Sequence, residues 1–185
     1  MDRGEPARFR GADPGAVLVT GGAGYIGSHM ALALCDAGRE AVVIDNLSNG
    51  DIAAIPAGVT FHRGDVADAE LVRRVIRRHD VGLVMHFAGS VSLPESLERP
   101  LDYFRNNTGA SRSLATTCVE AGVRRFIFSS SAAVYGGAAP TPFREDDATA
   151  PLTPYGVSKL DTETLLRELS ESCPGFEAVS LRYFN

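Results

Sequence analysis

A tyrosine and a lysine stand four residues apart, at Tyr155 and Lys159, where the sequence predicts the start of a helix. This spacing puts both side chains on one helix face and within mutual reach. A free tyrosine titrates near pH ~10, so it becomes a base near neutrality only if a cation stabilises its phenolate. Lys159 can supply that charge, and the pair could then take a proton from a substrate hydroxyl. Because the same spacing arises by chance in many helices, the pair needs support from the elements around it.

Three serines, Ser129, Ser130 and Ser131, close an apolar run of strand length. Ligands of open parallel sheets bind at the carboxyl ends of the strands, which is where these serines are expected to lie. We predict that Ser131 hydrogen-bonds to the reacting oxygen and passes a proton towards Tyr155. The other two serines are expected to satisfy backbone groups at the strand end.

A glycine-rich segment, residues 21–27, lies between an apolar strand and the start of a helix. Gly21 and Gly22 permit a tight turn, Gly24 lets the backbone approach a pyrophosphate, and Gly27 allows the helix to pack closely on the strand. Free N–H groups and the helix dipole would hold the diphosphate. The alternative is a glycine-rich turn that binds nothing, which the flanking strand and helix disfavour.

An acidic residue, Asp45, follows Gly27 by eighteen positions at the end of the next apolar run. This spacing predicts a carboxylate that binds the adenosine ribose hydroxyls of a dinucleotide. A carboxylate also repels a 2'-phosphate, and no arginine stands beside it, so NAD is favoured over NADP. A strand-end aspartate that only caps a turn is the alternative. Asp65 is a weaker candidate for the adenine edge and could equally be a turn residue.

Apolar runs of strand length alternate with amphipathic stretches, which predicts an α/β fold with a doubly wound parallel sheet of the Rossmann type. The loop over residues 136–154 is expected to be ordered at the active site. Strands are predicted at residues 16–20, 41–45, 59–63, 81–88, 125–129 and 178–183, and helices at 25–37, 69–79, 101–121 and 154–170, with Gly38 and Gly122 after two of the helices.

The chain has 185 residues and a net charge of -5, which fits one domain over residues 16–185 preceded by a flexible tail, residues 1–15. Its basic residues are dispersed apart from one arginine cluster at helical spacing, residues 73–78, so no nucleic-acid partner is expected. No apolar run is long enough for a membrane span, and no histidine or cysteine set has the spacing of metal ligands. Three widely spaced cysteines indicate a reduced, cytoplasmic protein.

Six segments together resemble the UDP-glucose 4-epimerases, a family of NAD-dependent extended short-chain dehydrogenases. They are TGGAGYIGSH at 20–29, IDNLSNG at 44–50, HFAG at 86–89, FSSSAAVYG at 128–136, PYGVSK at 154–159 and LRYFN at 181–185. The resemblance implies interconversion of UDP-glucose and UDP-galactose through a 4-keto sugar on tightly bound NAD, with Tyr155 as the base and Lys159 on the nicotinamide ribose. It also implies substrate contacts at Ser131, Tyr155 and Asn185, and cofactor contacts at Tyr25, Ile26, Asn46, Asp65, Val66, Phe87, Ala88, Gly89, Asn106 and Phe184.

The chain departs from this family at two points. Some members carry a lysine near the cofactor phosphates where Val91 stands, so diphosphate binding is expected to depend more on backbone N–H groups. Members are also about twice as long, so we expect an N-terminal fragment that lacks most of the substrate-binding part. The family further implies a UDP-sugar as partner and allows a homodimer.

Two other functions remain open from the sequence. A nucleotide-sugar 4,6-dehydratase shares the glycine loop and the Tyr155 and Lys159 pair. Enzymes of that kind otherwise resemble this chain, but they carry an Asp-Glu pair at the positions where this chain has Ala132 and Ala133. A non-catalytic NAD-binding remnant is the second alternative, and an NADPH-linked keto-sugar reductase is disfavoured by Asp45. His86 could line the cofactor cleft, although a satisfied core histidine is the favoured interpretation.

Overall fold

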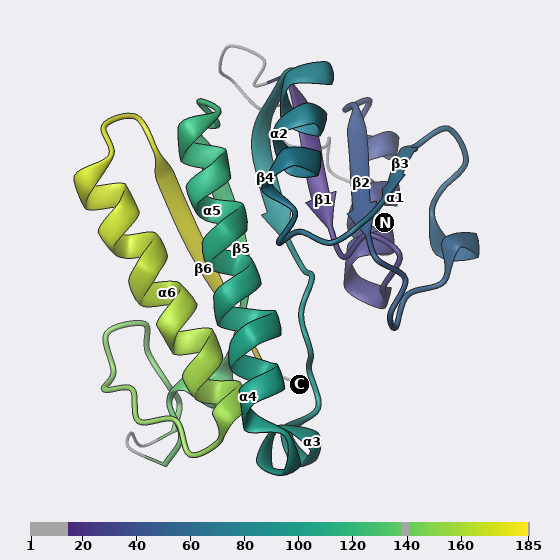
Figure 1. Ribbon diagram of the computed structural model, residues 1–185. Helices are drawn as coiled ribbons and strands as arrows, with labels where there is room; N and C mark the ends of the chain where they lie inside the picture. The colour runs from purple at the N-terminus through teal and green to yellow at the C-terminus, as the bar shows by residue number, and fades with distance from the viewer. Residues whose placement is uncertain (1–14, 138–140, 185) are drawn as a thin grey trace, which may run out of the picture.

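Six parallel strands form one sheet in the order β3-β2-β1-β4-β5-β6 (Figure 1). The computed structural model describes residues 15–137 and 141–184. The sheet order reverses between β1 and β4, so the crevice beyond their carboxyl ends is where a ligand is expected to bind. The strands run over Ala16–Thr20 (β1), Ala41–Asp45 (β2), Thr60–Arg63 (β3), Val81–His86 (β4), Arg125–Ser131 (β5) and Glu177–Tyr183 (β6).

The predicted doubly wound α/β fold is confirmed, but two strand ends were wrong. The strand predicted over residues 81–88 stops at His86, because the glycine turn after β1 packs against the next stretch of backbone: a Cβ on Gly21 would lie 2.6 Å from the backbone nitrogen of Ala88. The strand predicted to end at Ser129 continues to Ser131, since β6 pairs with it along its full length.

Helices cover both faces of the sheet. Figure 1 shows α2, α5 and α6 side by side across one face, while α1 packs against β1 and β2 on the other. Gly38 follows α1 with a φ of 68°, the left-handed conformation predicted for it. The helices are Tyr25–Asp36 (α1), Ala69–Arg78 (α2), Leu93–Glu98 (α3), Pro100–Tyr103 (α4), Ala110–Glu120 (α5) and Pro154–Ser172 (α6), with 3-10 turns at Ile52–Ala54 (η1) and Ala132–Val134 (η3).

The helix predicted over residues 101–121 is not a uniform α-helix. It comprises α4, a π-helical segment at Phe104–Gly109 (η2), and α5. The wider turns of η2 carry two adjacent asparagines, Asn106 and Asn107, and such π-helical insertions are frequent at functional sites. Sequence periodicity could not separate this segment from the α-helices on either side.

Alternating residues of the central strands fill two separate cores. Leu18, Val42 and Val84 belong to the larger core, under α2, α5 and α6, whereas Val17 and Val43 belong to the smaller core on the α1 side. This alternation follows from the period-two geometry of a strand, and it explains why nearly every residue of β1 and β2 is apolar.

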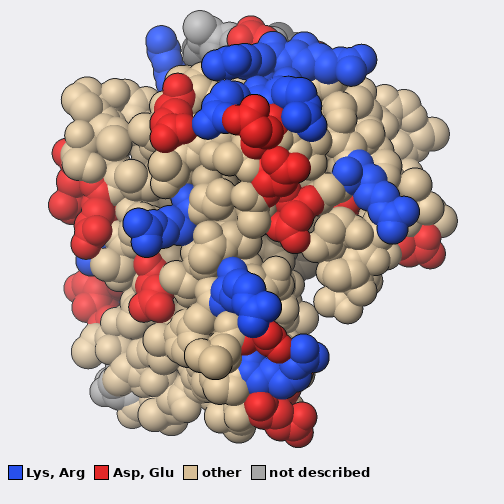
Figure 2. Space-filling view, viewed as in Figure 1, with Lys and Arg blue, Asp and Glu red and all other residues tan. Residues whose placement is uncertain are grey.

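The exposed surface agrees with the expected solvated arginine face. Figure 2 shows a group of positively charged side chains at the end of the molecule where α2 terminates, and Arg74, Arg77 and Arg78 of that helix are exposed. No helix within residues 15–137 and 141–184 is long and apolar enough to cross a bilayer. The predicted tail, residues 1–15, lies outside the described residues except for Gly15, which bridges to Val81 and so belongs to the domain.

Candidate active site

The glycine turn holds α1 against the end of β1. Gly21 has a φ of 70°, and its N–H donates to the carbonyl of Ile44 at 2.9 Å. A Cβ on Gly27 would lie 2.2 Å from the carbonyl oxygen of Gly21, so only glycine permits this approach of helix to turn. α1 begins at Tyr25 without a side-chain cap among the described residues, which leaves its first N–H groups able to bind an anion.

Asp45 braces this turn from the end of β2. One carboxylate oxygen accepts the N–H of Ala23 at 3.0 Å, and the other accepts the N–H of Leu47 at 2.7 Å. The carboxylate therefore caps a turn, as the alternative interpretation held, and also fixes the glycine segment. Its unused lone pairs leave the predicted ribose contact open.

Asn46 and Asp65 meet beside Asp45, with the Asn46 amide donating to the Asp65 carboxylate at 3.3 Å. The other Asp65 oxygen accepts the N–H of Ala67 at 2.9 Å, the turn geometry that the sequence left open. Val66 packs its side chain into the large core, so only its backbone is left for the predicted cofactor contact.

Tyr155, Lys159 and the end of β5 come together on one face of α6. Tyr155 and Lys159 are buried, and the Lys159 Nζ lies 5.8 Å from the centre of the Tyr155 ring. The Lys159 ammonium donates to the carbonyl of Ser129 at 2.9 Å. The spacing argument thus placed the two side chains correctly, on the same helix face and above the end of a strand.

Burial opposes the expected acidification of Tyr155. Burial raises the pKa of Tyr155, and a hydrogen bond with Ser131 opposes that rise. Burial also lowers the pKa of Lys159 to about 8. The physical reason is that desolvation disfavours both charged forms, and the ammonium is directed at the Ser129 carbonyl instead of the phenol oxygen.

The three serines have different partners. Ser131 accepts the N–H of Ala133 at 3.2 Å, and its side chain is near enough to Tyr155 to oppose the rise in the pKa of that residue. Ser130 was expected to satisfy backbone groups, but it donates to the buried carboxylate of Glu163. That carboxylate was not identified from the sequence, although it lies one further turn along α6 from Lys159.

The loop after β4 brings a glycine close to Lys159. Gly89 has a φ of 154°, and a Cβ there would lie 3.0 Å from the Oδ1 of Asn107 and 3.8 Å from the Lys159 Nζ. Asn107 is buried, accepts the N–H of Ser90 at 2.8 Å and donates to the Ser158 hydroxyl at 3.1 Å. It therefore ties this loop to α6, a role the sequence analysis missed in favour of its neighbour Asn106.

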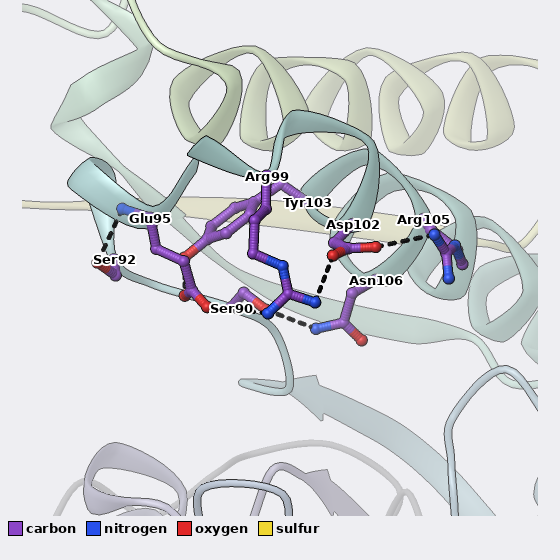
Figure 3. A network of polar contacts seen from close by, with 8 residues as sticks. All are labelled: Ser90, Ser92, Glu95, Arg99, Asp102, Tyr103, Arg105 and Asn106. Atoms are coloured by element: carbon purple, nitrogen blue, oxygen red, sulfur yellow. Dashed lines mark hydrogen bonds and ion pairs between the residues drawn. The ribbon is translucent and has the colours of Figure 1, made fainter. Parts of the chain in front are cut away.

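The exposed side of η2 and α3 holds a polar network (Figure 3). Asn106 donates to the Ser90 hydroxyl at 2.8 Å, and the Tyr103 hydroxyl donates to Glu95 at 2.8 Å. Burial and the Glu95 hydrogen bond raise the pKa of Tyr103 to about 12. The Tyr103 ring packs edge-on against Tyr155, with 6.4 Å between centroids, so the network supports the Tyr155 ring from one side.

The remaining predicted contacts are spread around the crevice. Tyr25 and Ile26 are exposed at the start of α1, while Phe87 and Ala88 are half-buried beside the glycine turn. Phe184 is exposed and stacks near Tyr135, with 6.3 Å between ring centroids. The substrate contact predicted at Asn185 lies outside the described residues.

His86 is a core residue. Its ring is buried, with Nδ1 hydrogen-bonded to the Thr20 hydroxyl at 2.6 Å and Nε2 to the Ser111 hydroxyl at 2.8 Å. Burial, together with the positive charge of Lys159, lowers the pKa of His86 to about 3. The favoured interpretation, a satisfied histidine, is confirmed.

The His86 pKa predicts a pH-dependent stability. Because the pKa is lowered by folding, the imidazole is fully stabilising above pH ~6.5, and that contribution falls as the pH drops towards 3, by about 3 kcal/mol between pH 7 and pH 4. Replacing His86 with Gln should lower stability at pH 7 but flatten this slope, as measured by urea unfolding at a series of pH values. The same change at exposed His29 should leave the slope intact, and an equal slope in both variants would contradict the assignment.

Comparisons with known proteins agree with this geometry. The family model described as "NAD dependent epimerase/dehydratase family" matches residues 17–185. A UDP-glucose 4-epimerase of Azospirillum brasilense is 56% identical over 169 residues, 91% of this chain and 48% of that protein. One from Streptomyces lividans is 44% identical over 172 residues, 92% of this chain and 52% of that protein.

The chain is also similar in fold to solved structures of UDP-glucose 4-epimerases. The UDP-glucose 4-epimerase of Brucella ovis in complex with NAD superposes with a TM-score of 0.89 at 40% identity, covering 92% of this chain and 52% of that one. The enzyme of Bifidobacterium longum in complex with NAD+ and UDP gives a TM-score of 0.88 at 36% identity, covering 92% and 53%. The chain spans about half the length of the relatives it matches.

Proposed function

Because the chain belongs to the NAD dependent epimerase/dehydratase family, we propose that it binds NAD and carries the proton-transfer groups of a UDP-glucose 4-epimerase. Residues 16–185 form the NAD-binding domain in this proposal. The observation that carries it is the position of the Lys159 ammonium, which lies 5.8 Å from the centre of the Tyr155 ring and 3.8 Å from where a Cβ on Gly89 of the β4 loop would stand. The ammonium is therefore near both the proton-transfer face of α6 and the β4 loop, beside which a dinucleotide would lie.

The residues present fit a dinucleotide. The glycine turn and the uncapped start of α1 form a cradle for a diphosphate, since added Cβ atoms at Gly21 and Gly27 would meet backbone at 2.6 Å and 2.2 Å. Asp45 would hold the adenosine ribose, and its carboxylate would disfavour the 2'-phosphate of NADP. Tyr25, Ile26, Asn46, Asp65, Val66, Phe87, Ala88, Asn106 and Phe184 would complete the contacts.

The chain's own groups would handle the proton at the sugar 4-hydroxyl. When bound, NAD supplies a reversible acceptor for the C4 hydride and a positively charged ring. Tyr155 would remove the proton from the 4-hydroxyl and later return it to the same oxygen, once the hydride has been added back to the opposite face of C4. Ser131, already hydrogen-bonded to Tyr155, holds the reacting oxygen, and Lys159 favours the phenolate by its charge. Because the base is buried, its phenolate needs both positive charges nearby.

The proposal extends to the setting and assembly of the protein. A UDP-sugar is the substrate, and Asn185 is assigned to its binding. The three cysteines are free in the structure, in keeping with a cytoplasmic protein. A homodimer is also proposed, for which the exposed apolar side chains of Leu93, Leu97 and Leu101 on α3 and α4 provide surface.

Calorimetric titration with NAD and with NADP, paired with a coupled epimerase assay on the 185-residue chain, tests the proposal. We expect NAD to bind at least about tenfold more tightly than NADP, because Asp45 would face the 2'-phosphate, and we expect UDP-galactose to be converted to UDP-glucose. Asp45→Asn should weaken NAD binding and narrow the difference between the two cofactors. NAD binding without turnover would instead identify a non-catalytic NAD-binding module, and absence of both would refute the proposal.

A further inference from the structure

The proton-transfer face of α6 carries a third charged residue, Glu163. Tyr155, Lys159 and Glu163 follow one another at four-residue intervals, so they lie on one face of the helix. This face packs on β5, where Lys159 donates to the Ser129 carbonyl and Glu163 accepts from the Ser130 hydroxyl. A carboxylate one turn from an ammonium group normally pairs with it.

Glu163 pairs instead with Arg182 of β6. The Arg182 Nε donates to Oε1 at 3.0 Å and Nη2 donates to Oε2 at 2.7 Å, a two-pronged contact between groups that are 9% and 20% exposed. The remaining Arg182 nitrogen, Nη1, donates to the Glu145 carbonyl at 3.2 Å, and the guanidinium lies 4.7 Å from the centre of the Tyr135 ring. The guanidinium is therefore fixed from several sides, and within the described residues no ion pair joins Glu163 to Lys159.

The groups facing Lys159 differ in charge. His86 approaches from β4 and stays neutral, because burial and Lys159 itself lower its pKa to about 3. Tyr155 faces Lys159 from its own helix, and burial raises its pKa, so it is also neutral near pH 7. Glu163 is the carboxylate on this face, and Arg182 lies on its far side. The electrostatic potential at Lys159 thus depends on whether the Glu163 carboxylate is paired with Arg182.

We propose that Arg182 is a positioning residue that engages the Glu163 carboxylate and thereby keeps it away from the Lys159 ammonium. The ammonium then stays on the Ser129 carbonyl, beside Tyr155 and Gly89. The inference rests on the proposed function, in which Lys159 serves the site. Loss of Arg182 would leave the buried Glu163 carboxylate without its partner, one helical turn from Lys159. The ammonium would then move towards this carboxylate and away from the Ser129 carbonyl.

Lys159 is the only lysine in the sequence, so the inference can be tested directly. Carbon-13 labelling of lysine at Cε gives one side-chain resonance, whose pH titration reports the pKa of Lys159 in the 185-residue chain without cofactor or substrate. For Arg182→Met we expect that pKa to rise by about 1 to 3 pH units, the effect of an opposite charge at close range. In the double variant Glu163→Gln/Arg182→Met the pKa should return close to its starting value.

An unchanged pKa in Arg182→Met, or a raised pKa that persists in the double variant, would overturn the inference. If Arg182→Met fails to fold because a buried charge is left unpaired, the double variant still decides, since removing both charges is far less costly. A double-variant pKa more than about one pH unit below that of the unmodified chain would show that Glu163 already supports Lys159. None of these results depends on NAD binding or turnover, so failure of the epimerase proposal is detected separately.

Discussion

Replacing Tyr155 with Phe is expected to lower the rate of UDP-glucose and UDP-galactose interconversion by about 10² to 10⁴-fold, the contribution of one positioned acid-base group. The substitution removes only the phenol oxygen, and the ring can keep its contacts with Tyr103 and Lys159. NAD affinity should therefore change little, because the cradle for the diphosphate lies on the glycine turn. The coupled assay gives the rate, and calorimetry gives the affinity for NAD.

A matched control is Tyr103→Phe, which removes a second buried phenol oxygen. This oxygen donates to Glu95 at 2.8 Å, so its loss should cost about 1 kcal/mol of stability and retain most of the activity. Undiminished turnover in Tyr155→Phe would mean that another group takes the sugar proton. Equal loss in the two variants would mean that packing, and not proton transfer, explains the effect.

Replacing Gly27 with Ala is expected to abolish most of the NAD affinity, by about 10²-fold, and to destabilise the fold. The new Cβ would lie 2.2 Å from the Gly21 carbonyl oxygen and 2.8 Å from the Gly22 Cα, both backbone atoms that cannot move aside independently. The start of α1 must shift, which withdraws its N–H groups from the diphosphate, and each charged hydrogen bond contributes about 1.5 to 3 kcal/mol. Calorimetry with NAD and urea unfolding measure the two effects.

Gly109→Ala provides the control for a glycine-to-alanine change in a helix. The nearest atom to a Cβ at Gly109, the Phe104 carbonyl oxygen, is 3.6 Å away, an ordinary contact. That variant should gain about 0.5 to 1 kcal/mol of stability from the reduced freedom of the unfolded chain, with no loss of NAD affinity. NAD binding by Gly27→Ala at wild-type strength would exclude the glycine turn as the diphosphate site.

Local patterns in the sequence were enough to predict the sheet and to bring together the candidate groups for proton transfer. Strand and helix periods are local properties, so the apolar runs around Leu18 and Val42 predicted buried parallel strands. Likewise, residues four apart share a face of any α-helix, so the interval from Tyr155 to Lys159 was enough to predict that their side chains lie together.

Only the tertiary structure decided which groups neutralise or support one another. The partner of Glu163, Arg182, is nineteen residues away on β6, and Asn107 lies in a π-helical segment whose altered turns leave no mark in the hydrophobic pattern. Burial raises the pKa of Tyr155, an effect that local sequence patterns do not reveal, because desolvation depends on how the whole chain packs around a group. Spacing along a helix determines which residues can meet, whereas burial and long-range partners determine the charge each one carries.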